Sequence, residues 1–223
     1  MQIFAKVPEP GRVKTRLASG IGHTAAAKLY RDLVERTLTT AVSARETGAV
    51  SEIEVWCDPD PSHAAFEDWK RRYGVTLRSQ RGPDLGTRMH HALASVLAEE
   101  QAALLIGTDC PAMDATYLAR AAEALKTHDV VVGPAEDGGY VLIGLSRDVD
   151  IFSDVPWSTS DVMAITRIKI AAAGATLREL PRLWDLDTPA DFARFSSSHT
   201  RPMRRTFPWR RPPAGSRPHA RRS

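Results

Sequence analysis

The chain has 223 residues, which is enough for one sizeable α/β domain. Its formal net charge of +3 comes from its C-terminal end: residues 196–223 contain eight arginines and no acidic residue or lysine, so residues 1–195 carry −5 (3 − 8). This mildly acidic part excludes a general nucleic-acid-binding surface, and Cys57 and Cys110 lack the paired spacing of a zinc site or disulfide framework.

Short apolar runs typical of strands alternate along the chain with longer amphipathic segments typical of helices. Strands are predicted at 2–5, 52–57, 76–79, 102–106, 129–133, 140–145 and 176–180, and helices at 24–43, 62–73, 85–99, 114–126, 160–173 and 189–195. This alternation predicts one α/β domain over residues 1–195, with a mostly parallel sheet flanked by helices. The link at Gly138-Gly139 is too short for a crossover, so the sheet should be mixed.

The first predicted strand leads into a basic loop over residues 6–17, with two prolines, Gly11 and four cations. The cations are Lys6, Arg12, Lys14 and Arg16. A stiff loop of this kind at the carboxyl edge of a sheet suits a phosphate chain, because Lys supplies a point charge and Arg a planar fork. The spacing is neither that of a P-loop nor that of a dinucleotide fingerprint. A solvated basic loop is the alternative.

A second glycine-rich stretch, residues 80–89, opens the third predicted helix. Its backbone amides, with Gly86 and Arg88, could meet an anion at the helix N-terminus, and Asp84 could accept a hydrogen bond from a base or ribose hydroxyl. Alternatively, Asp84 is only an N-cap and the glycines only form a turn. Both interpretations remain open from the sequence.

Asp109 follows the apolar run 102–106, in the motif Gly107-Thr108-Asp109-Cys110-Pro111. The run reads as a strand buried on both faces, so Asp109 lies at its carboxyl end, where open α/β sheets bind ligands. A capping role in the following turn is the alternative for this residue alone.

The stretch 133–140 places acidic, glycine and aromatic residues between two strands. Paired glycines, Gly138 and Gly139, let a ligand approach the backbone, and Tyr140 could stack on an acceptor or hydrogen-bond to it. A plain hairpin would also use Asp137-Gly138-Gly139.

The segment 185–191 carries a second acidic step and a helix start. Thr188 as N-cap, Pro189 at the first helical position and Asp191 at the third explain three of its residues. Asp185 and Asp187 remain as candidates. One carboxylate at a buried strand end and another from the far end of the domain suit a divalent cation and a diphosphate.

Residues 196–223 form a basic, proline-rich tail with too few apolar residues to pack, so we expect it to be disordered. It could make non-specific contacts with RNA, DNA or an anionic membrane. No apolar stretch approaches the roughly 18 residues needed to span a bilayer, and we expect a cytoplasmic protein.

Together the motifs at 4–17, 84–89, 107–111, 137–140, 157–159 and 185–189 resemble a bacterial family of uncharacterised GT-A-type transferases. That family is often described as glycosyltransferases and is linked by genomic context to arsenosugar-like pathways. More distantly, the chain is similar to 2-phospho-L-lactate guanylyltransferase and molybdenum cofactor guanylyltransferase. The resemblance implies a single Rossmann-like nucleotide-diphospho-sugar transferase domain, with the nucleotide at the N-terminal half and the acceptor at the C-terminal half.

The resemblance also implies roles for individual residues. Asp109 matches the metal-binding aspartate, Asp187 is the second ligand, and the metal is Mg²⁺ or Mn²⁺. The basic loop holds the phosphates through Lys6, Gly11, Lys14 and Arg16, of which Lys14 and Arg16 also act in catalysis with Asp109. The nucleotide-side loop contributes Asp84, Gly86 and Arg88, and the acceptor side consists of Asp137, Gly138, Gly139, Tyr140 and Trp157.

The predicted function is metal-dependent transfer from a nucleotide-activated donor, most simply of a sugar to a small acceptor. Nucleotidyl transfer with pyrophosphate release is the alternative, since both reactions break a bond in a metal-bound phosphate chain. The guanylyltransferases usually begin with a Gly-Gly loop, whereas this chain has Pro10-Gly11 with lysines, so the sequence does not establish nucleotidyl transfer. The choice of sugar transfer rests on the family resemblance. A catalytically degenerate nucleotide-binding module is a third possibility.

Overall fold

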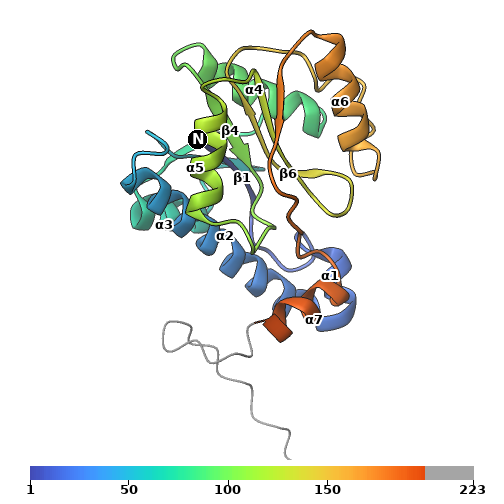
Figure 1. Cartoon of the computed structure of the whole chain (residues 1–223). Coiled ribbons are helices and arrows are strands. Elements are labelled where there is room, and N and C mark those ends of the chain that lie inside the picture. Colours follow the sequence, from blue (N-terminus) through green and yellow to red (C-terminus); the bar gives the residue numbers. More distant parts are fainter. Residues whose placement is uncertain (199–223) are drawn as a thin grey trace, which may run out of the picture.

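A seven-stranded sheet forms the centre of the protein in a computed structural model that describes residues 1–198 (Figure 1). Within these residues the strands are β1 Gln2–Lys6, β2 Glu54–Asp58, β3 Thr76–Ser79, β4 Ala103–Ile106, β5 Val130–Pro134, β6 Tyr140–Leu145 and β7 Leu177–Glu179. The helices are α1 Thr15–Ile21, α2 His23–Glu46, α3 Ala64–Tyr73, α4 Leu85–Leu97, α5 Ala115–Ala124, α6 Val162–Ala172 and α7 Pro189–Ser198. The predicted tail lies outside the described residues from residue 199 onward.

The strand order β3-β2-β1-β4-β6-β5-β7 confirms the predicted α/β fold with a mixed sheet. Strands β3, β2, β1 and β4 are parallel, β6 is antiparallel to both β4 and β5, and β7 is parallel to β5. The link between β5 and β6 contains residues 135–139, which can join only antiparallel neighbours. The parallel half therefore directs the carboxyl ends of β1, β2, β3 and β4 to one edge.

Strand β4, at the centre of the sheet, is apolar along its whole length because helices cover both faces of the sheet. In β4, Leu104 and Ile106 pack into one hydrophobic cluster, and Ala103 and Leu105 pack into the other, as the two-residue period of a strand requires. The first cluster is completed by residues of α2, α3 and α5, and the second by residues of α4 and α6. The sheet is thus a rigid base for the loops at its edges.

Helix α1 was not predicted, because the sequence places residues 15–17 in the basic loop. The helix has only seven residues, and its N-cap, Lys14, makes no capping hydrogen bond through its side chain. Leu17 of α1 instead packs with Leu33 and Leu186 in a small separate cluster. Tertiary packing therefore stabilises a helix that lacks the usual start signals.

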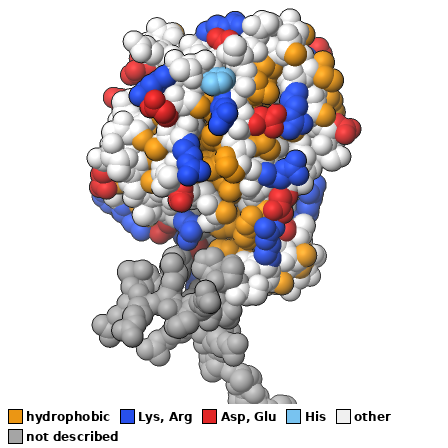
Figure 2. Space-filling view, viewed as in Figure 1, with side chains coloured by type: hydrophobic (Ala, Val, Ile, Leu, Met, Phe, Trp, Pro, Cys, Tyr) orange, Lys and Arg blue, Asp and Glu red, His pale blue; other side chains and the backbone are white. Residues whose placement is uncertain are grey.

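The other predicted elements exist, and most of their ends are shifted by one or two residues, as is usual for helix and strand termini. Strand β1 continues through Lys6, and helix α7 continues to Ser198, past the predicted domain boundary at residue 195. Among the described residues, no helix is long and apolar enough to cross a lipid bilayer. Figure 2 shows Lys and Arg side chains interspersed with Asp and Glu side chains on the visible face.

The side chain of Asp129 reinforces the backbone pairing of edge strand β7 with β5. This carboxylate accepts hydrogen bonds from Thr176 N (2.8 Å), Thr176 Oγ1 (2.9 Å) and Arg147 Nε (2.9 Å). The backbone hydrogen bond from Thr176, reinforced by Arg147, lowers the pKa of Asp129 to about 2. A carboxyl group with a lowered pKa stabilises the folded state at pH values above its unfolded pKa of about 3.9.

Substitution of Asp129 by Asn should therefore lower the melting temperature at pH 7 by a few degrees. The difference from the wild type should shrink as the pH falls from about 4 toward 2, because protonation of Asp129 removes the same charge in the wild type. Thermal denaturation over this pH range tests the prediction. Glu123→Gln is the control, since Glu123 forms an ion pair with Lys126 on an exposed helix surface. A difference that stays constant with pH would contradict the assigned role.

Candidate functional site

Three segments far apart in the sequence meet at Lys14. The Lys14 Nζ atom lies 2.7 Å from Asp109 Oδ1 and 2.6 Å from Asp187 Oδ1. The Lys14 side chain is 3% exposed, whereas the two aspartate side chains are 41% and 42% exposed. The ammonium is thus enclosed while both carboxylates still face solvent, which leaves them accessible to a ligand.

The geometry of this group follows from the elements around it. Lys14 immediately precedes α1 and has a left-handed backbone (φ 50°, ψ 41°). Asp109 lies three residues beyond β4, and its carbonyl oxygen accepts a hydrogen bond from Leu186 N (2.8 Å). Because the Leu186 side chain is fully buried, it anchors the segment that carries Asp187.

Helix α7 begins two residues after Asp187, and its first turn fixes the backbone of Asp187. Asp191 Oδ2 accepts hydrogen bonds from Thr188 N (2.7 Å), Thr188 Oγ1 (2.7 Å) and Asp187 N (3.1 Å). Thr188 Oγ1 in turn accepts one from Asp191 N (3.3 Å). The predicted capping roles of Thr188 and Asp191 are confirmed, and the Asp187 side chain remains available to pair with Lys14.

The electrostatics of the site are dominated by carboxylates. Burial alone would lower the pKa of Lys14, but the charges of Asp109 and Asp187 outweigh burial and raise it. The pKa of Asp185 is raised to about 7, first by burial and then by the charges of Asp109, Asp137 and Asp187. Asp185 therefore belongs to the same charged group. The Asp-x-Asp spacing of residues 185–187 kept Asp185 among the candidates, but the family resemblance gave the role of second ligand to Asp187.

The donor set fits a divalent cation that also binds a phosphate. A single ammonium contacts both Asp109 and Asp187, so one cation can lie within reach of both carboxylates. Within residues 1–198 there is no group of three or more His, Cys, Asp or Glu side chains that could hold a metal ion by itself. Mg²⁺ commonly takes one or two carboxylates and completes its shell with phosphate oxygens and water, so two aspartates are sufficient.

The rest of the basic loop is more open than Lys14. The side chains of Lys6 and Arg16 make no ion pair with any other described residue, and both residues are exposed. Lys6 N donates to the hydroxyl of Tyr30 (2.7 Å), which fixes the backbone at the end of β1. Gly11 has a φ of +84°, and a β-carbon added there would have no neighbour within 4 Å, so backbone conformation is the reason for glycine there. The side chains of Lys6 and Arg16, on the same loop as Lys14, are therefore free to meet an anion.

Tyr30 is a site-supporting residue that sequence reasoning missed. Besides Lys6 N, its hydroxyl contacts Thr108 Oγ1 (3.3 Å), next to Asp109. Burial raises its pKa, so the phenol stays neutral. It lies within the apolar face of α2, where nothing in the helical spacing distinguishes it from a core aromatic.

In the glycine-rich loop at residues 80–89, Asp84 and Gly86 have structural roles. Asp84 caps α4, accepting from Thr87 N (2.8 Å) and Thr87 Oγ1 (2.9 Å), as the capping interpretation predicts. A β-carbon added at Gly86 would lie 2.6 Å from Trp157 Nε1, so this glycine permits close packing of α4 on the Trp157 loop.

Arg88, the third candidate of this loop, faces the carboxyl end of β2. Its Nε donates to the carbonyl of Gly82 (2.9 Å), and its Nη1 lies 3.6 Å from Asp58 Oδ2. The guanidinium therefore lies at the same edge of the sheet as the end of β1. This is the edge where the sequence predicts the nucleotide.

The predicted acceptor side contains a loop and an aromatic pair. Gly138 has a φ of +94°, and a β-carbon there would overlap the carbonyl oxygen of Ser160, so the loop docks closely on the N-terminus of α6. Asp137 Oδ1 accepts from Gly139 N (3.0 Å), as in a plain hairpin turn. The loop is thus held rigidly beside α6.

Tyr140 and Trp157 form the aromatic pair, with ring centroids 6.3 Å apart and an edge-on geometry. The Tyr140 hydroxyl is buried and has no hydrogen-bond partner among the described residues, and burial raises its pKa. A buried polar atom without a partner is uncommon in folded proteins. Because Trp157 also packs on Gly86, the pair connects the predicted nucleotide side with the predicted acceptor side.

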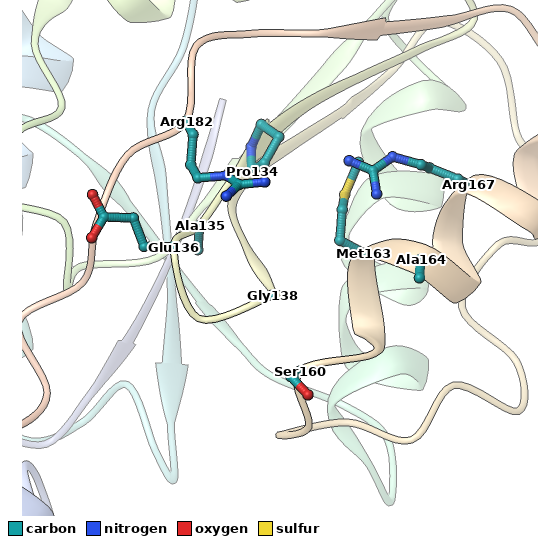
Figure 3. Close-up of a pocket in the computed structure, with 9 residues that line it drawn as sticks. All are labelled: Pro134, Ala135, Glu136, Gly138, Ser160, Met163, Ala164, Arg167 and Arg182. Atoms are coloured by element: carbon teal, nitrogen blue, oxygen red, sulfur yellow. The ribbon is translucent and has the colours of Figure 1, made fainter.

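A pocket of about 170 Å³ opens between the Gly138 loop and α6 (Figure 3). It is lined by Pro134, Ala135, Glu136, Gly138, Ser160, Met163, Ala164, Arg167 and Arg182. The sequence pointed to Gly138 in this set but gave no signal for the two arginines, which are isolated in the chain.

The sequence model of DUF2064, described as an uncharacterised protein conserved in bacteria, matches residues 40–159, which is more than half of the chain. A proposed nucleotide-diphospho-sugar transferase from Desulfovibrio desulfuricans G20 is 30% identical in sequence, with a TM-score of 0.80. The match covers 91% of this chain and 87% of that one. None of the curated proteins matches this chain significantly in sequence.

Two further solved structures share the fold at low sequence identity. The 4-diphosphocytidyl-2C-methyl-D-erythritol synthase from Anaerococcus prevotii has a TM-score of 0.59 at 10% identity, with 90% of this chain and 98% of that chain covered. A nucleotidyl transferase from Methanothermobacter has a TM-score of 0.58 at 16% identity, with 88% and 96% covered. At these identities the likeness establishes the fold alone.

Proposed function

This chain belongs to the DUF2064 family of proteins conserved in bacteria, and from this premise we propose that it is a transferase that uses a nucleotide-activated donor. The reaction is metal-dependent transfer of a sugar from a nucleotide-sugar to a small acceptor. The likeness to the Desulfovibrio desulfuricans protein supports this class of reaction, since that structure is described as a nucleotide-diphospho-sugar transferase.

One observation carries the proposal: Asp109 and Asp187 converge on the same buried ammonium at the carboxyl edge of the parallel strands. Ligands bind at that edge in open α/β sheets. The exposed cations Lys6 and Arg16 lie on the same basic loop as Lys14. The site thus combines carboxylates that can bind a divalent cation with basic side chains that can bind phosphates. A metal–diphosphate complex needs both kinds of side chain.

In the proposed mechanism the protein orients the donor and stabilises its leaving group. Asp109 and Asp187 would hold Mg²⁺ or Mn²⁺, and the bound ion would supply Lewis-acid stabilisation of the diphosphate. Lys14 and Arg16 place positive charge where negative charge grows as the bond to the phosphate chain breaks. The rigid sheet edge fixes these groups in advance, so little reorganisation is needed during the reaction.

Nucleotidyl transfer is the second candidate, because solved structures with this fold include a nucleotidyl transferase from Methanothermobacter. The two reactions differ in the atom attacked. Sugar transfer breaks the bond between the anomeric carbon and phosphate oxygen and releases a nucleoside diphosphate. Nucleotidyl transfer attacks the α-phosphorus and releases pyrophosphate. The link to arsenosugar-like pathways and the similarity to guanylyltransferases stay predictions.

A thermal-shift panel of nucleotide-sugars and nucleoside triphosphates, with and without Mg²⁺ or Mn²⁺, tests this function. A ligand present at a hundred times its dissociation constant stabilises the folded state by about 2.7 kcal/mol. We expect metal-dependent stabilisation by a nucleotide-sugar, and release of a nucleoside diphosphate when acceptors are added. Stabilisation only by a triphosphate, with pyrophosphate release, would replace sugar transfer by nucleotidyl transfer. No shift with any nucleotide would overturn the proposed function, whereas a shift without release of any product would favour a degenerate nucleotide-binding module.

A further inference from the structure

We propose that the pocket between the Gly138 loop and α6 binds an anionic group of the acceptor, a carboxylate or a phosphate, between Arg167 and Arg182. The assignment of this group to the acceptor rests on the proposed transferase function. Binding of the anion itself is a property of the pocket, and can be tested without donor or metal.

Two guanidinium groups face the pocket from opposite walls. Figure 3 shows Arg182 on the segment that precedes Asp185 and Arg167 on α6, with their guanidinium groups directed toward each other across the gap. Both residues are exposed, so the pocket is open to solute. Two planar guanidinium forks that converge on one space match the oxygens of a carboxylate or phosphate.

The two arginines differ in what holds them. Arg167 is fixed by Glu179, with Nε–Oε1 and Nη2–Oε2 distances of 2.7 Å and 2.9 Å. Arg182 makes no hydrogen bond or ion pair with any residue in the described part of the chain. It lies near enough to Glu136 and Glu179 to contribute to the lowering of their pKa values, which is due first to Arg194 and Arg167 respectively. The guanidinium group of Arg167 is therefore held in position, and that of Arg182 is available to bind an anion.

The acidic residue of the pocket is already paired. Glu136 accepts two hydrogen bonds from Arg194, at 2.7 Å and 3.1 Å, and Figure 3 shows its carboxylate directed away from Arg167. The Glu136–Arg194 pair and the Glu179–Arg167 pair are each neutral overall, so the positive charge of Arg182 is left unbalanced at the pocket. The other lining residues include Pro134, Met163 and Ala164, which offer no competing charge. The net charge thus selects an anion over a cation.

The pocket and the aspartate site share two segments of chain. Ala135 forms a parallel bridge with Leu183, and Glu136 N donates to Leu183 O (2.9 Å), which ties the Gly138 loop to the segment that continues to Asp185. Arg182 is three residues before Asp185, so their α-carbons are at most about 11 Å apart. A small acceptor anchored at Arg182 can therefore present its other end to the donor beside Asp109 and Asp187.

Residue-specific NMR of the full chain tests the pocket directly, with inorganic phosphate and acetate as probes at constant ionic strength and without nucleotide or divalent cation. The amide resonances of Gly138 and Ala164 should shift and saturate with phosphate or acetate. Arg182→Gln should weaken this binding about tenfold or more, because a charge-assisted hydrogen bond is lost. Stronger binding of phosphate than of acetate would identify the group as a phosphate, and the reverse would identify a carboxylate.

Matched controls separate the pocket from general surface charge. Arg178→Gln removes the same charge from exposed Arg178 on β7, outside the pocket, and should bind phosphate like the wild type. Ala164→Glu adds a carboxylate inside the pocket and should weaken phosphate binding. Ile168→Glu adds a carboxylate outside the pocket, at a position on the same helix that is 68% exposed, and should bind phosphate like the wild type.

Two results would overturn the assignment. One is the absence of saturable shifts at Gly138 and Ala164, and the other is equal phosphate binding by the Arg182→Gln and Arg178→Gln proteins. Because the assay contains no donor and no divalent cation, either result would leave the proposed function standing. Failure of every nucleotide to stabilise the protein would overturn the proposed function and leave anion binding in the pocket unaffected.

Discussion

Replacing Asp109 by Asn should lower turnover by about 100- to 1,000-fold, a loss typical of removing one group that stabilises charge in a transition state. The substitution keeps the shape of the side chain but removes its negative charge, so the site holds a divalent cation and its diphosphate less well. The fold should persist, because the Asp109 side chain is 41% exposed and its carbonyl still accepts from Leu186 N. Product release by the variant and its melting temperature are the two measurements.

Asp114→Asn is the matched control for this experiment. Asp114 is five residues further along the chain and caps α5 by accepting from Tyr117 N (2.8 Å), a role that Asn also fills well. Its turnover should stay close to that of the wild type. Near-normal turnover of the Asp109→Asn protein would remove Asp109 from the reaction.

Replacing Lys14 by Met should destabilise the protein by about 1–3 kcal/mol in the absence of divalent cations. Loss of one partner from a buried ion pair commonly costs about 3–5 kcal/mol, and we reduce this figure because Asp109 and Asp187 are partly exposed. The variant leaves these carboxylates close together without a counter-charge. Millimolar Mg²⁺ should therefore raise the melting temperature of the variant more than that of the wild type.

Lys6→Met provides the control for the Lys14 experiment, since Lys6 is an exposed lysine at the start of the same loop. Its melting temperature should equal that of the wild type with and without Mg²⁺. An unchanged stability of the Lys14→Met protein, or an equal Mg²⁺ response in both proteins, would show that the ion pairs of Lys14 do not hold the site together.

Much of the fold could be predicted because apolar runs and turn residues mark its strands clearly. Strands β3 and β6 occupy the residues predicted for them, and the short link at Gly138-Gly139 correctly indicated an antiparallel pair. Helix α1 was missed because it depends on Leu17 packing against Leu33 and Leu186, a contact between distant segments. Local propensity carries no information about such contacts.

The candidate site was predictable only in part, for the same reason. The strand-end position of Asp109 and the double aspartate at 185–187 are visible in the sequence. The pairing of Lys14 with both carboxylates is not, because it requires the left-handed turn before α1 and the anchoring of Leu186. Arg167 and Arg182 line one pocket because the Gly138 loop docks on α6 and also pairs with Leu183, so the isolated arginines gave no signal for the pocket.

The central claim is that Asp109 and Asp187 together hold a divalent cation that carries a diphosphate. Water-proton relaxation measurements of Mn²⁺ with inorganic pyrophosphate test it most directly, because they report protein-bound Mn²⁺ without any knowledge of the donor. The account predicts binding by the wild type and the Asp114→Asn protein, and binding weakened about tenfold or more in Asp109→Asn and Asp187→Asn, since each variant loses one of two charged ligands. Equal Mn²⁺ binding by all four proteins would contradict it.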